Sequence, residues 1–399
     1  MRVCAKRVAT APDYTTTLSM TSPVLLCSNT FWSIYNFRRG PIAALLAAGH
    51  PVHVAAPDDA FATQLAEMGC VVHRVPMAAK GQNPLQDLGL MWRLFCLYRQ
   101  VRPAVIFHYT IKPNIYGSIA ARLAHIPCVS MTTGLGYVFI RESLTTRLAR
   151  QLYRVAFRHT LENWFLNAED HRAFVEGGLV AIGKTRLLPG EGVDLAHFAK
   201  APWPTSNSPA DAPPEPMRFL LIARLLRDKG VLEYVEAARA LRAEMPHLTF
   251  QMLGATDVEN PSAVTRSEVD AWQREGVVEY LGTTRDVRPI IANAHCVVLP
   301  SYREGLSRTL LEASAMGRPL VASDVPGCRD VINDGVTGRL VRARDAAALT
   351  ACLRDMAQIP ARQLVRMGDA GRAKVAREFD EHVVIAEYFR ILGSLPASC

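Results

Sequence analysis

Two glutamates and the glycine beside the first of them form the strongest candidate for chemistry in this sequence. Glu304 and Gly305 follow a short apolar run, and Glu312 stands eight residues after Glu304, inside a helical pattern that opens near Ser307. The first backbone N–H groups of a helix have no partner within the helix, so Gly305, Leu306 and Ser307 suit a phosphate. A carboxylate two turns further on can accept hydrogen bonds from a ribose diol. Each glutamate alone is more often a helix cap or a solvated side chain, and only their ordered combination favours a site.

A second candidate is the pair of cations Arg224 and Lys229. Arg224 stands where a predicted strand at 218–223 ends, and Lys229 comes just before a predicted helix at 231–244. Two cations at a helix N-terminus can clamp a diphosphate. The alternative is a solvated basic loop, and these residues alone do not decide between the two.

The first half of the chain offers a weaker group of candidates. His108 and Lys112 lie where a predicted strand runs into a helix, and we expect His108 to face a cleft and Lys112 to meet an acceptor phosphate. A lone histidine at a strand end is more often a structural hydrogen-bonding group. Gly134 and Gly136 follow another predicted strand and suit a loop that closely approaches a ligand.

One motif match is set aside. Residues 178–185 fit the P-loop expression, but a P-loop needs a strand before it and a helix after it, and here a helical stretch precedes and a short strand follows. The chain also lacks Asp-x-Asp, His-x-Glu and His-Glu-x-x-His motifs. We therefore expect no metal ion and no other cofactor.

The elements that must position these residues alternate regularly along 399 residues, of which 49% are hydrophobic and 21% charged. Apolar runs predict strands at 24–28, 52–57, 71–76, 104–109, 128–132, 164–167, 218–223, 248–253, 277–281, 296–300, 320–323 and 338–341. Helical patterns lie between or after them at 85–102, 114–123, 231–244, 267–275, 309–316, 346–356 and 360–395. This alternation predicts an α/β protein with two doubly wound, mostly parallel sheets facing a cleft, where ligands bind beyond the carboxyl ends of the strands.

Composition shifts divide the chain further. Six prolines between 201 and 216 predict a linker. We expect a flexible extension at 1–20, a first domain at 21–200, a second at 217–375, and a C-terminal helix at 376–399 that packs back on the first domain.

Charge and cysteine usage limit the partners and the compartment. The net charge of +8 favours an anionic partner, and the basic amphipathic stretches 85–102 and 141–158 can lie on an anionic membrane, although such helices are more often ordinary surface helices. No apolar run reaches the ~18 residues of a membrane-spanning helix. The nine cysteines are scattered without a Cys-x-x-Cys pair, which predicts free thiols in a reducing compartment.

The segment from Glu304 to Glu312, together with residues 317–319, 326–329 and 334–338, resembles the family-4 retaining glycosyltransferases, which have the GT-B fold of two Rossmann-like domains. Residues 108–116, 133–137 and 254–261 look like a bacterial subgroup that builds undecaprenyl-diphosphate-linked saccharides. The resemblance implies transfer of a sugar, such as an N-acetylhexosamine, from a UDP-sugar, with UDP favoured over GDP. It also implies an enzyme that lies peripherally on the cytoplasmic face of the inner membrane and binds no nucleic acid.

The resemblance also implies roles for individual residues. Arg224 and Lys229 would neutralise the leaving diphosphate, Glu312 would bind the ribose, and Glu304 would contact the transferred sugar, with His108 as a fourth catalytic candidate. The implied nucleotide-sugar contacts are Gly254, Thr283, Gly305, Leu306, Ser307 and Glu312, and the implied acceptor-side residues are Asn36, Lys112, Gly134 and Gly136. No metal is needed, and retention would follow from front-face attack, with the leaving phosphate taking the proton of the acceptor. The loop expected at 29–40 lacks the paired glycines of many relatives.

Three alternatives remain open from the sequence. The chain could be a transferase for a soluble acceptor, a UDP-sugar epimerase on the same fold, or a nucleotide-sugar-binding protein without catalysis. The intact set of Glu304, Glu312, Arg224 and Lys229 argues against the last.

Overall fold

Two parallel sheets organise the computed structural model, which describes residues 22–77, 84–134, 144–204, 217–258 and 260–396. The first sheet has the strand order β3-β2-β1-β4-β5-β6-β7 and the second the order β10-β9-β8-β11-β12-β13. The first sheet consists of β1 (Val24–Cys27), β2 (Val52–Ala56), β3 (Val71–Arg74), β4 (Val105–Tyr109), β5 (Cys128–Thr132), β6 (Glu162–Phe165) and β7 (Thr185–Leu187). The second consists of β8 (Arg218–Ile222), β9 (Thr249–Leu253), β10 (Glu279–Tyr280), β11 (Cys296–Leu299), β12 (Leu320–Ser323) and β13 (Gly338–Val341). Two doubly wound α/β sheets are thus confirmed.

Helices connect nearly all of these strands, as parallel pairing requires. In the first half they are α1 (Phe31–Ala47), α2 (Ala62–Glu67), α3 (Pro84–Val101), α4 (Ser118–Ala124), α5 (Leu144–Phe157) and α6 (Ala168–Glu176), with a π-helical turn at Pro113–Gly117. In the second half they are α7 (Val231–Glu244), α8 (Arg266–Arg274), α9 (Arg288–Asn293), α10 (Arg308–Ala315), α11 (Ala346–Gln358), α12 (Ala361–Glu378) and α13 (Glu381–Ser394).

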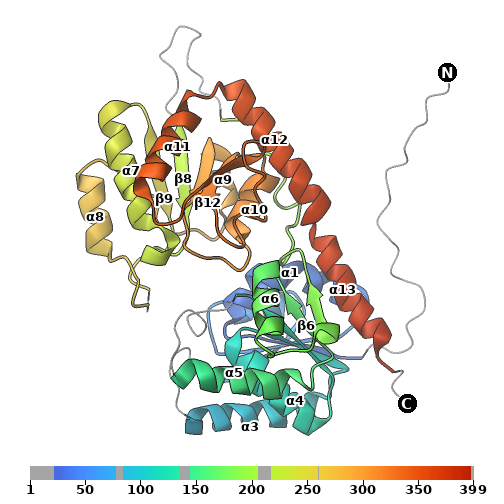
Figure 1. Ribbon diagram of the computed structural model, residues 1–399. Coiled ribbons are helices and arrows are strands. Elements are labelled where there is room, and N and C mark those ends of the chain that lie inside the picture. The colour runs from blue at the N-terminus through green and yellow to red at the C-terminus, as the bar shows by residue number, and fades with distance from the viewer. Residues whose placement is uncertain (1–21, 78–83, 135–143, 205–216, 259, 397–399) are drawn as a thin grey trace, which may run out of the picture. The chain divides into compact units, whose positions relative to one another are not determined.

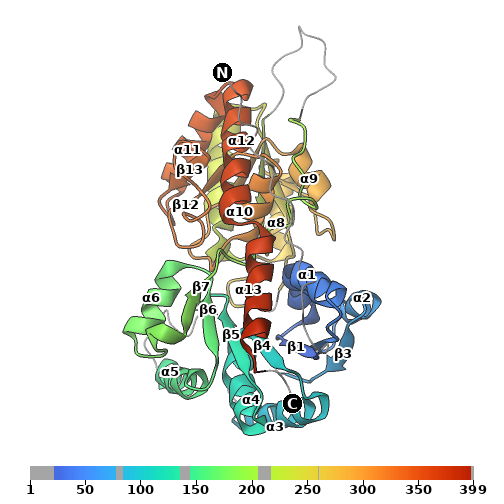
Figure 2. The same cartoon turned by 90° about the vertical axis from the view of Figure 1, so that its right-hand side faces the viewer.

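The chain divides into two compact units. Unit 1 holds the described residues up to Met131, Val155–Glu162 and those from Glu387 onward, and unit 2 holds Thr132–Arg154 and Asn163–Ala386. In unit 1, α3 and α4 lie side by side (Figure 2) and pack on Leu25 and Ile106 of the sheet.

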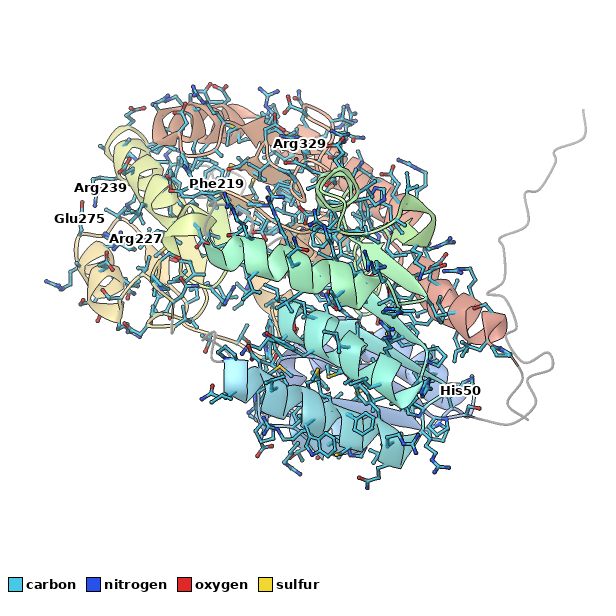
Figure 3. All side chains as sticks on the ribbon, turned by 60° about the horizontal axis from the view of Figure 1, so that its bottom comes forward. His50, Phe219, Arg227, Arg239, Glu275 and Arg329 are labelled. Atoms are coloured by element: carbon cyan, nitrogen blue, oxygen red, sulfur yellow. The ribbon has the colours of Figure 1, made fainter. Side chains whose placement is uncertain are left out.

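Unit 2 buries both faces of the second sheet. Successive side chains of a strand point to opposite faces, so Phe219 joins the core cluster that includes residues of α7 and α11, whereas Leu220 joins the cluster that includes residues of α9 and α10. Figure 1 shows α7 and α11 on one side of β8 and β9, and Figure 3 marks Phe219 among them. This two-sided burial fixes β8, β9 and β11, whose carboxyl ends carry the candidate residues.

Most predicted element bounds differ from the structure by one or two residues, but three expectations need correction. The segment expected as a loop at 29–40 is mostly helix, because α1 begins at Phe31 and continues through Pro41. The strand expected at 164–167 lies at Glu162–Phe165. The helical tail breaks after Glu378, where the Val193 N–H donates to the Phe379 carbonyl at 2.9 Å.

The described part of the chain contains free thiols and no membrane-spanning helix. Its seven cysteines are all free thiols; Cys27, Cys70, Cys128, Cys296 and Cys328 are buried, Cys96 is exposed and Cys352 is intermediate. No helix among the described residues is long and apolar enough to cross a bilayer. The expected extension at 1–20 and residues 205–216 of the expected linker lie outside the described residues, and the expected domain limits remain predictions.

Candidate active site

Close backbone contacts bring together the loops that follow β8, β9 and β11. Gly254 has φ +152°, and a Cβ atom there would lie 1.7 Å from the Ala223 carbonyl oxygen, so only glycine fits. Gly230, at φ +72°, would place a Cβ atom 2.0 Å from the Pro300 carbonyl oxygen. The three loops therefore meet at one edge of the second sheet.

An ion pair joins two of the candidate residues at this edge. The Lys229 ammonium donates to Glu304 Oε1 at 2.6 Å, and the two side chains are only 18% and 14% exposed. The Asp228 carbonyl, next to Lys229, accepts hydrogen bonds from the Tyr302 N–H at 2.9 Å and the Ser301 hydroxyl at 3.3 Å. The backbone on both sides thus holds the lysine and the glutamate in register.

The turn after Glu304 leads into α10 as the sequence predicts. A Cβ atom on Gly305 would lie 2.2 Å from the Thr133 carbonyl oxygen, so this position has no room for a side chain. Ser307 is the N-cap of α10, and its hydroxyl accepts from the Leu310 N–H at 3.3 Å. The Ser307 N–H donates to the Gly327 carbonyl at 3.0 Å, so it is already used. The backbone donors expected for a phosphate are therefore those of Gly305 and Leu306.

Glu312 lies on the second turn of α10 and is mostly buried. Arg308 Nε donates to Glu312 Oε1 at 2.8 Å. Burial raises the pKa of Glu312, and the charge and hydrogen bond of Arg308 oppose that rise. Arg308 therefore favours the ionised carboxylate that a ribose diol would need.

The remaining candidates of this edge lie on neighbouring loops. Arg224 is exposed just beyond β8, and Thr283 is exposed next to Gly282, whose carbonyl accepts the Gly254 N–H at 2.8 Å. The nearby Arg227, which Figure 3 labels, is instead paired with Glu268 of α8. The second sheet thus gathers its predicted candidates at one edge, with Lys229 and Glu304 in direct contact.

The sequence did not reveal a polar group from α6 that reaches the same turn. Arg303 Nη2 donates to the buried carboxylate of Asp170, and Asn167 Nδ2 donates to the Gly305 carbonyl at 2.7 Å. Burial raises the pKa of Asp170, while hydrogen bonds from Arg303 and Asn167 oppose this. The one signal available in the sequence was an asparagine before a helical pattern, which marks a helix cap and not a partner far along the chain.

His108 does not face a cleft, contrary to expectation. It is fully buried within β4, with the Tyr98 hydroxyl 2.9 Å from Nε2 and the Ser118 hydroxyl 3.2 Å from Nδ1. Burial lowers its pKa to about 3, so the imidazole is neutral at pH 7. This geometry favours the structural reading of His108.

The residues expected on the acceptor side lie on several different elements. The Lys112 ammonium lies 2.9 Å from Asp87 Oδ1 in a mostly buried ion pair, which the sequence did not suggest. Asn36 lies within α1 and donates to the Trp32 carbonyl at 2.9 Å, so it does not belong to a loop. Gly134 has φ +146° and packs against Gly305, whereas Gly136 lies outside the described residues.

Two negative expectations can be compared with the structure. Residues 178–185 follow α6 and lead into β7, so the helix–strand order excludes a P-loop there, as predicted. Within the described ranges, no cluster of three or more His, Cys, Asp or Glu side chains is arranged to hold a metal ion.

Comparison with known proteins agrees with this architecture. Residues 216–358 match the family model described as glycosyl transferases group 1, and residues 23–162 match the glycosyl transferase 4-like model; together they cover more than half of the chain. The N,N'-diacetylbacillosaminyl-diphospho-undecaprenol alpha-1,3-N-acetylgalactosaminyltransferase of Campylobacter jejuni is 28% identical over 371 residues, 90% of this chain and 95% of that protein. The UDP-Gal:alpha-D-GlcNAc-diphosphoundecaprenol alpha-1,3-galactosyltransferase of Escherichia coli is 25% identical over 280 residues, 68% of this chain and 70% of that protein.

A solved structure shows the same fold. The Anabaena protein HepE, in complex with UDP and glucose, superposes with a TM-score of 0.75 at 19% identity, over 94% of this chain and all of that chain. At this identity the likeness concerns the fold, which is the GT-B arrangement expected from the sequence.

Proposed function

We propose that this chain, which belongs to the group 1 and 4-like glycosyltransferases, moves a sugar from a UDP-sugar to a polyprenyl-diphosphate-linked saccharide. The observation that carries this proposal is the Lys229–Glu304 ion pair at the edge where α10 begins. The transferred sugar is an N-acetylhexosamine, and the product serves the assembly of a cell-surface polysaccharide or glycan.

The ion pair matches the charges that develop in the reaction. Breaking a glycosyl–phosphate bond builds negative charge on the leaving phosphate and positive charge on the sugar. Lys229, joined by Arg224, faces the phosphate, and Glu304 faces the sugar, so each end of the pair opposes the charge that forms beside it. A preorganised group of this kind lowers a barrier by roughly 3 kcal/mol.

The same residues allow the reaction to proceed without a metal. Lys229 and Arg224 supply the cationic charge that a metal would otherwise provide, and Glu312 holds the ribose through its carboxylate. The acceptor hydroxyl attacks from the face that the phosphate leaves, and the phosphate takes its proton, so the anomeric configuration is retained. The intact ion pairs of Glu304 and Glu312 support a working site over a non-catalytic one.

The names of two relatives support the choice of substrates. Both carry an undecaprenyl diphosphate acceptor in their names, one transfers N-acetylgalactosamine, and the other uses UDP-Gal. The first of them matches nearly the full length of both chains. A UDP-activated donor and a lipid-linked acceptor are therefore the substrates we propose here.

The exposed apolar side chains of α3 support a lipid-linked acceptor. On α3, Leu85, Leu88 and Trp92 follow one another at helical spacing and are exposed, Trp92 by 65%. Arg93 and Arg99 lie on the same helix, and exposed apolar side chains flanked by arginines suit an anionic lipid surface. We place the enzyme peripherally on the cytoplasmic face of the inner membrane, without a nucleic-acid partner.

The test is release of the nucleoside diphosphate from a panel of UDP- and GDP-sugars, with and without polyprenyl-diphosphate saccharides in anionic vesicles. We expect UDP release that rises when the lipid-linked acceptor is added and that disappears in a Glu304→Ala/Arg224→Ala double variant. Sugar interconversion without transfer would reveal an epimerase, and equal turnover on a water-soluble saccharide would reveal a soluble acceptor. Undiminished turnover in the double variant would overturn the proposed site.

The membrane contact needs a separate measurement. Flotation with anionic vesicles should recover the wild-type protein and recover less of a Leu88→Ser/Trp92→Ser variant. A Leu123→Ser variant is the matched control, because Leu123 is also exposed but lies on α4. Equal flotation of all three proteins would contradict a membrane contact through α3.

A further inference from the structure

The geometry points to Asn167 and Asp170, at the start of α6, as positioning residues that hold the Glu304–Gly305 backbone from both sides. This inference rests on the proposed function and deepens it, since it names what keeps Glu304 in place. The two residues lie more than 130 positions before the turn they hold, and both belong to unit 2 together with that turn.

The first anchor acts just before Glu304. Arg303 directs Nη2 to Asp170 Oδ1 in a short contact, and its Nη1 lies 3.8 Å from Glu169 Oε1. The Asp170 side chain is only 1% exposed, whereas Arg303 is 31% exposed. A buried carboxylate needs a cationic or hydrogen-bonding partner, so Asp170 holds Arg303 more tightly than a surface pair would.

The second anchor acts just after Glu304. Asn167 Nδ2 donates to the Gly305 carbonyl at 2.7 Å and also to Asp170 Oδ2 at 3.0 Å. The same side chain accepts the Asp170 N–H through Oδ1 at 2.8 Å. Both ends of the Asn167 amide are therefore fixed by Asp170 in the first turn of α6.

Capping alone does not account for this arrangement. An N-cap needs only a side-chain oxygen that accepts from the following turn, which Asn167 Oδ1 already provides. The cap does not need the donor end of the amide, which binds the Gly305 carbonyl, or a bond from Asp170 to Arg303, and these two contacts bracket Glu304 on both sides. The Glu304 carboxylate is then directed to Lys229, whose ammonium donates to it.

The consequence is a turn that cannot shift without breaking two anchors. Gly305 is also confined by the Thr133 carbonyl, which would lie 2.2 Å from a Cβ atom, so the turn is held on the opposite side as well. A displacement of about 1 Å in a group that aligns a reaction costs up to roughly 100-fold in rate. Loss of either anchor should therefore slow turnover even though neither residue touches the reacting atoms.

The experiment uses two variants of the full chain and one matched control. Asn167→Ser keeps a capping oxygen but removes the donor to Gly305, and Arg303→Gln removes the cationic partner of Asp170. Arg354→Gln is the control, because Arg354 also makes a two-point ion pair, with Glu244 at 3.0 Å on the exposed surface of α7 and α11. For each protein we would measure kcat and the KM of the donor per folded molecule, and amide hydrogen exchange in the peptide spanning residues 301–309.

We expect roughly a 10- to 100-fold fall in kcat for each of the two variants, with faster exchange in the 301–309 peptide. The control should match the wild type in both respects. The double variant should lose less than the product of the two single losses, because both anchors hold one turn. A purely structural role would instead lower the melting temperature while leaving kcat per folded molecule and exchange at 301–309 unchanged, and that result would overturn the inference.

The outcomes separate this inference from the proposed function. If the wild type releases no UDP from any donor, the proposed function fails, but hydrogen exchange in the 301–309 peptide still tests the anchors. If the wild type turns over and both variants equal it in kcat and exchange, the inference alone fails. If Asn167→Ser does not fold, the inference is tested by Arg303→Gln alone, because Arg303 is partly exposed and its substitution disturbs the core less.

Discussion

The Lys229 ammonium lies 2.6 Å from Glu304 Oε1, so each charge at the carboxyl edge of β8 and β11 is balanced by the other. A diphosphate that enters this edge competes with Glu304 for Lys229. The Glu304 carboxylate therefore has two opposite effects. It weakens nucleotide binding, and it stabilises the positive charge that develops on the sugar during transfer.

This competition predicts different effects of one substitution on binding and on turnover. In Glu304→Gln the ammonium of Lys229 loses its carboxylate partner, so we expect UDP to bind as tightly as in the wild type or several-fold more tightly. Without the negative charge beside the sugar, kcat should fall by roughly 100- to 1,000-fold. Calorimetric titration measures the affinity for UDP, and initial rates of UDP release give kcat. A parallel loss of affinity and kcat would contradict the role proposed for Glu304.

A second prediction compares two lysines, each of which stands in a motif that suggests phosphate binding. Lys229→Met should weaken UDP binding by at least about tenfold, because it removes a charge from the proposed diphosphate site. Lys184→Met, within the helix-to-strand segment that resembles a P-loop, should leave UDP binding unchanged. Equal losses in the two variants would mean that the nucleotide site lies elsewhere.

Local patterns explain why the second sheet and its edge could be predicted. Buried parallel strands are nearly continuous apolar runs, so the sequence predicts Leu320–Ser323, which is buried throughout, at its observed limits. The turn from Glu304 into α10 could be predicted for a similar reason, because a serine cap and a glycine are local signals. Chemistry that depends on such a turn is visible in a single sequence.

The predictions were wrong or incomplete where contacts with distant parts of the chain determine the environment of a residue. His108 belongs to a strand buried on both faces, so alternation along the strand gives no exposed side for it. The resemblance implied a loop at 29–40, yet α1 occupies most of that segment because Phe31, Ile34 and Leu45 of the helix are buried. Asn167 meets Gly305 across 138 residues, a contact that no local pattern encodes.

Glycine substitutions test the close approach at the turn. Gly305→Ala puts a methyl group 2.2 Å from the Thr133 carbonyl oxygen, so we expect a loss of about 1–3 kcal/mol in the free energy of unfolding, together with slower turnover. Gly183→Ala meets no atom within 4 Å and should change stability by less than about 0.5 kcal/mol. Denaturant unfolding of both variants checks this, and a neutral Gly305→Ala would show that the turn can move.

The raised pKa of Glu312 predicts a pH dependence of stability with a defined sign. Burial raises this pKa above its ordinary value of 4.5, so the folded protein binds the proton more tightly than the unfolded chain does. Stability contributed by this group therefore increases as pH falls from above the folded pKa towards 4.5. Glu312→Gln should abolish that increase, be no less stable than the wild type at pH 7, and raise the KM of the donor. If the unfolding free energy had the same pH dependence in the two proteins between pH 4.5 and 7, this prediction would be contradicted.

His108 predicts the opposite slope. The pKa of His108 is about 3 in the folded protein and 6.5 in the unfolded chain. Between these pH values the imidazole is protonated in the unfolded chain and neutral in the folded protein. The free energy of unfolding should therefore fall as pH drops below 6.5, by about 1.4 kcal/mol per pH unit well inside the window. His108→Asn should lose stability at pH 7 through its broken contacts with Tyr98 and Ser118, and its unfolding free energy should depend less on pH than that of the wild type. If the pH profile of kcat shifted in this variant while the stability profile did not, His108 would belong to the catalytic group and not to the core.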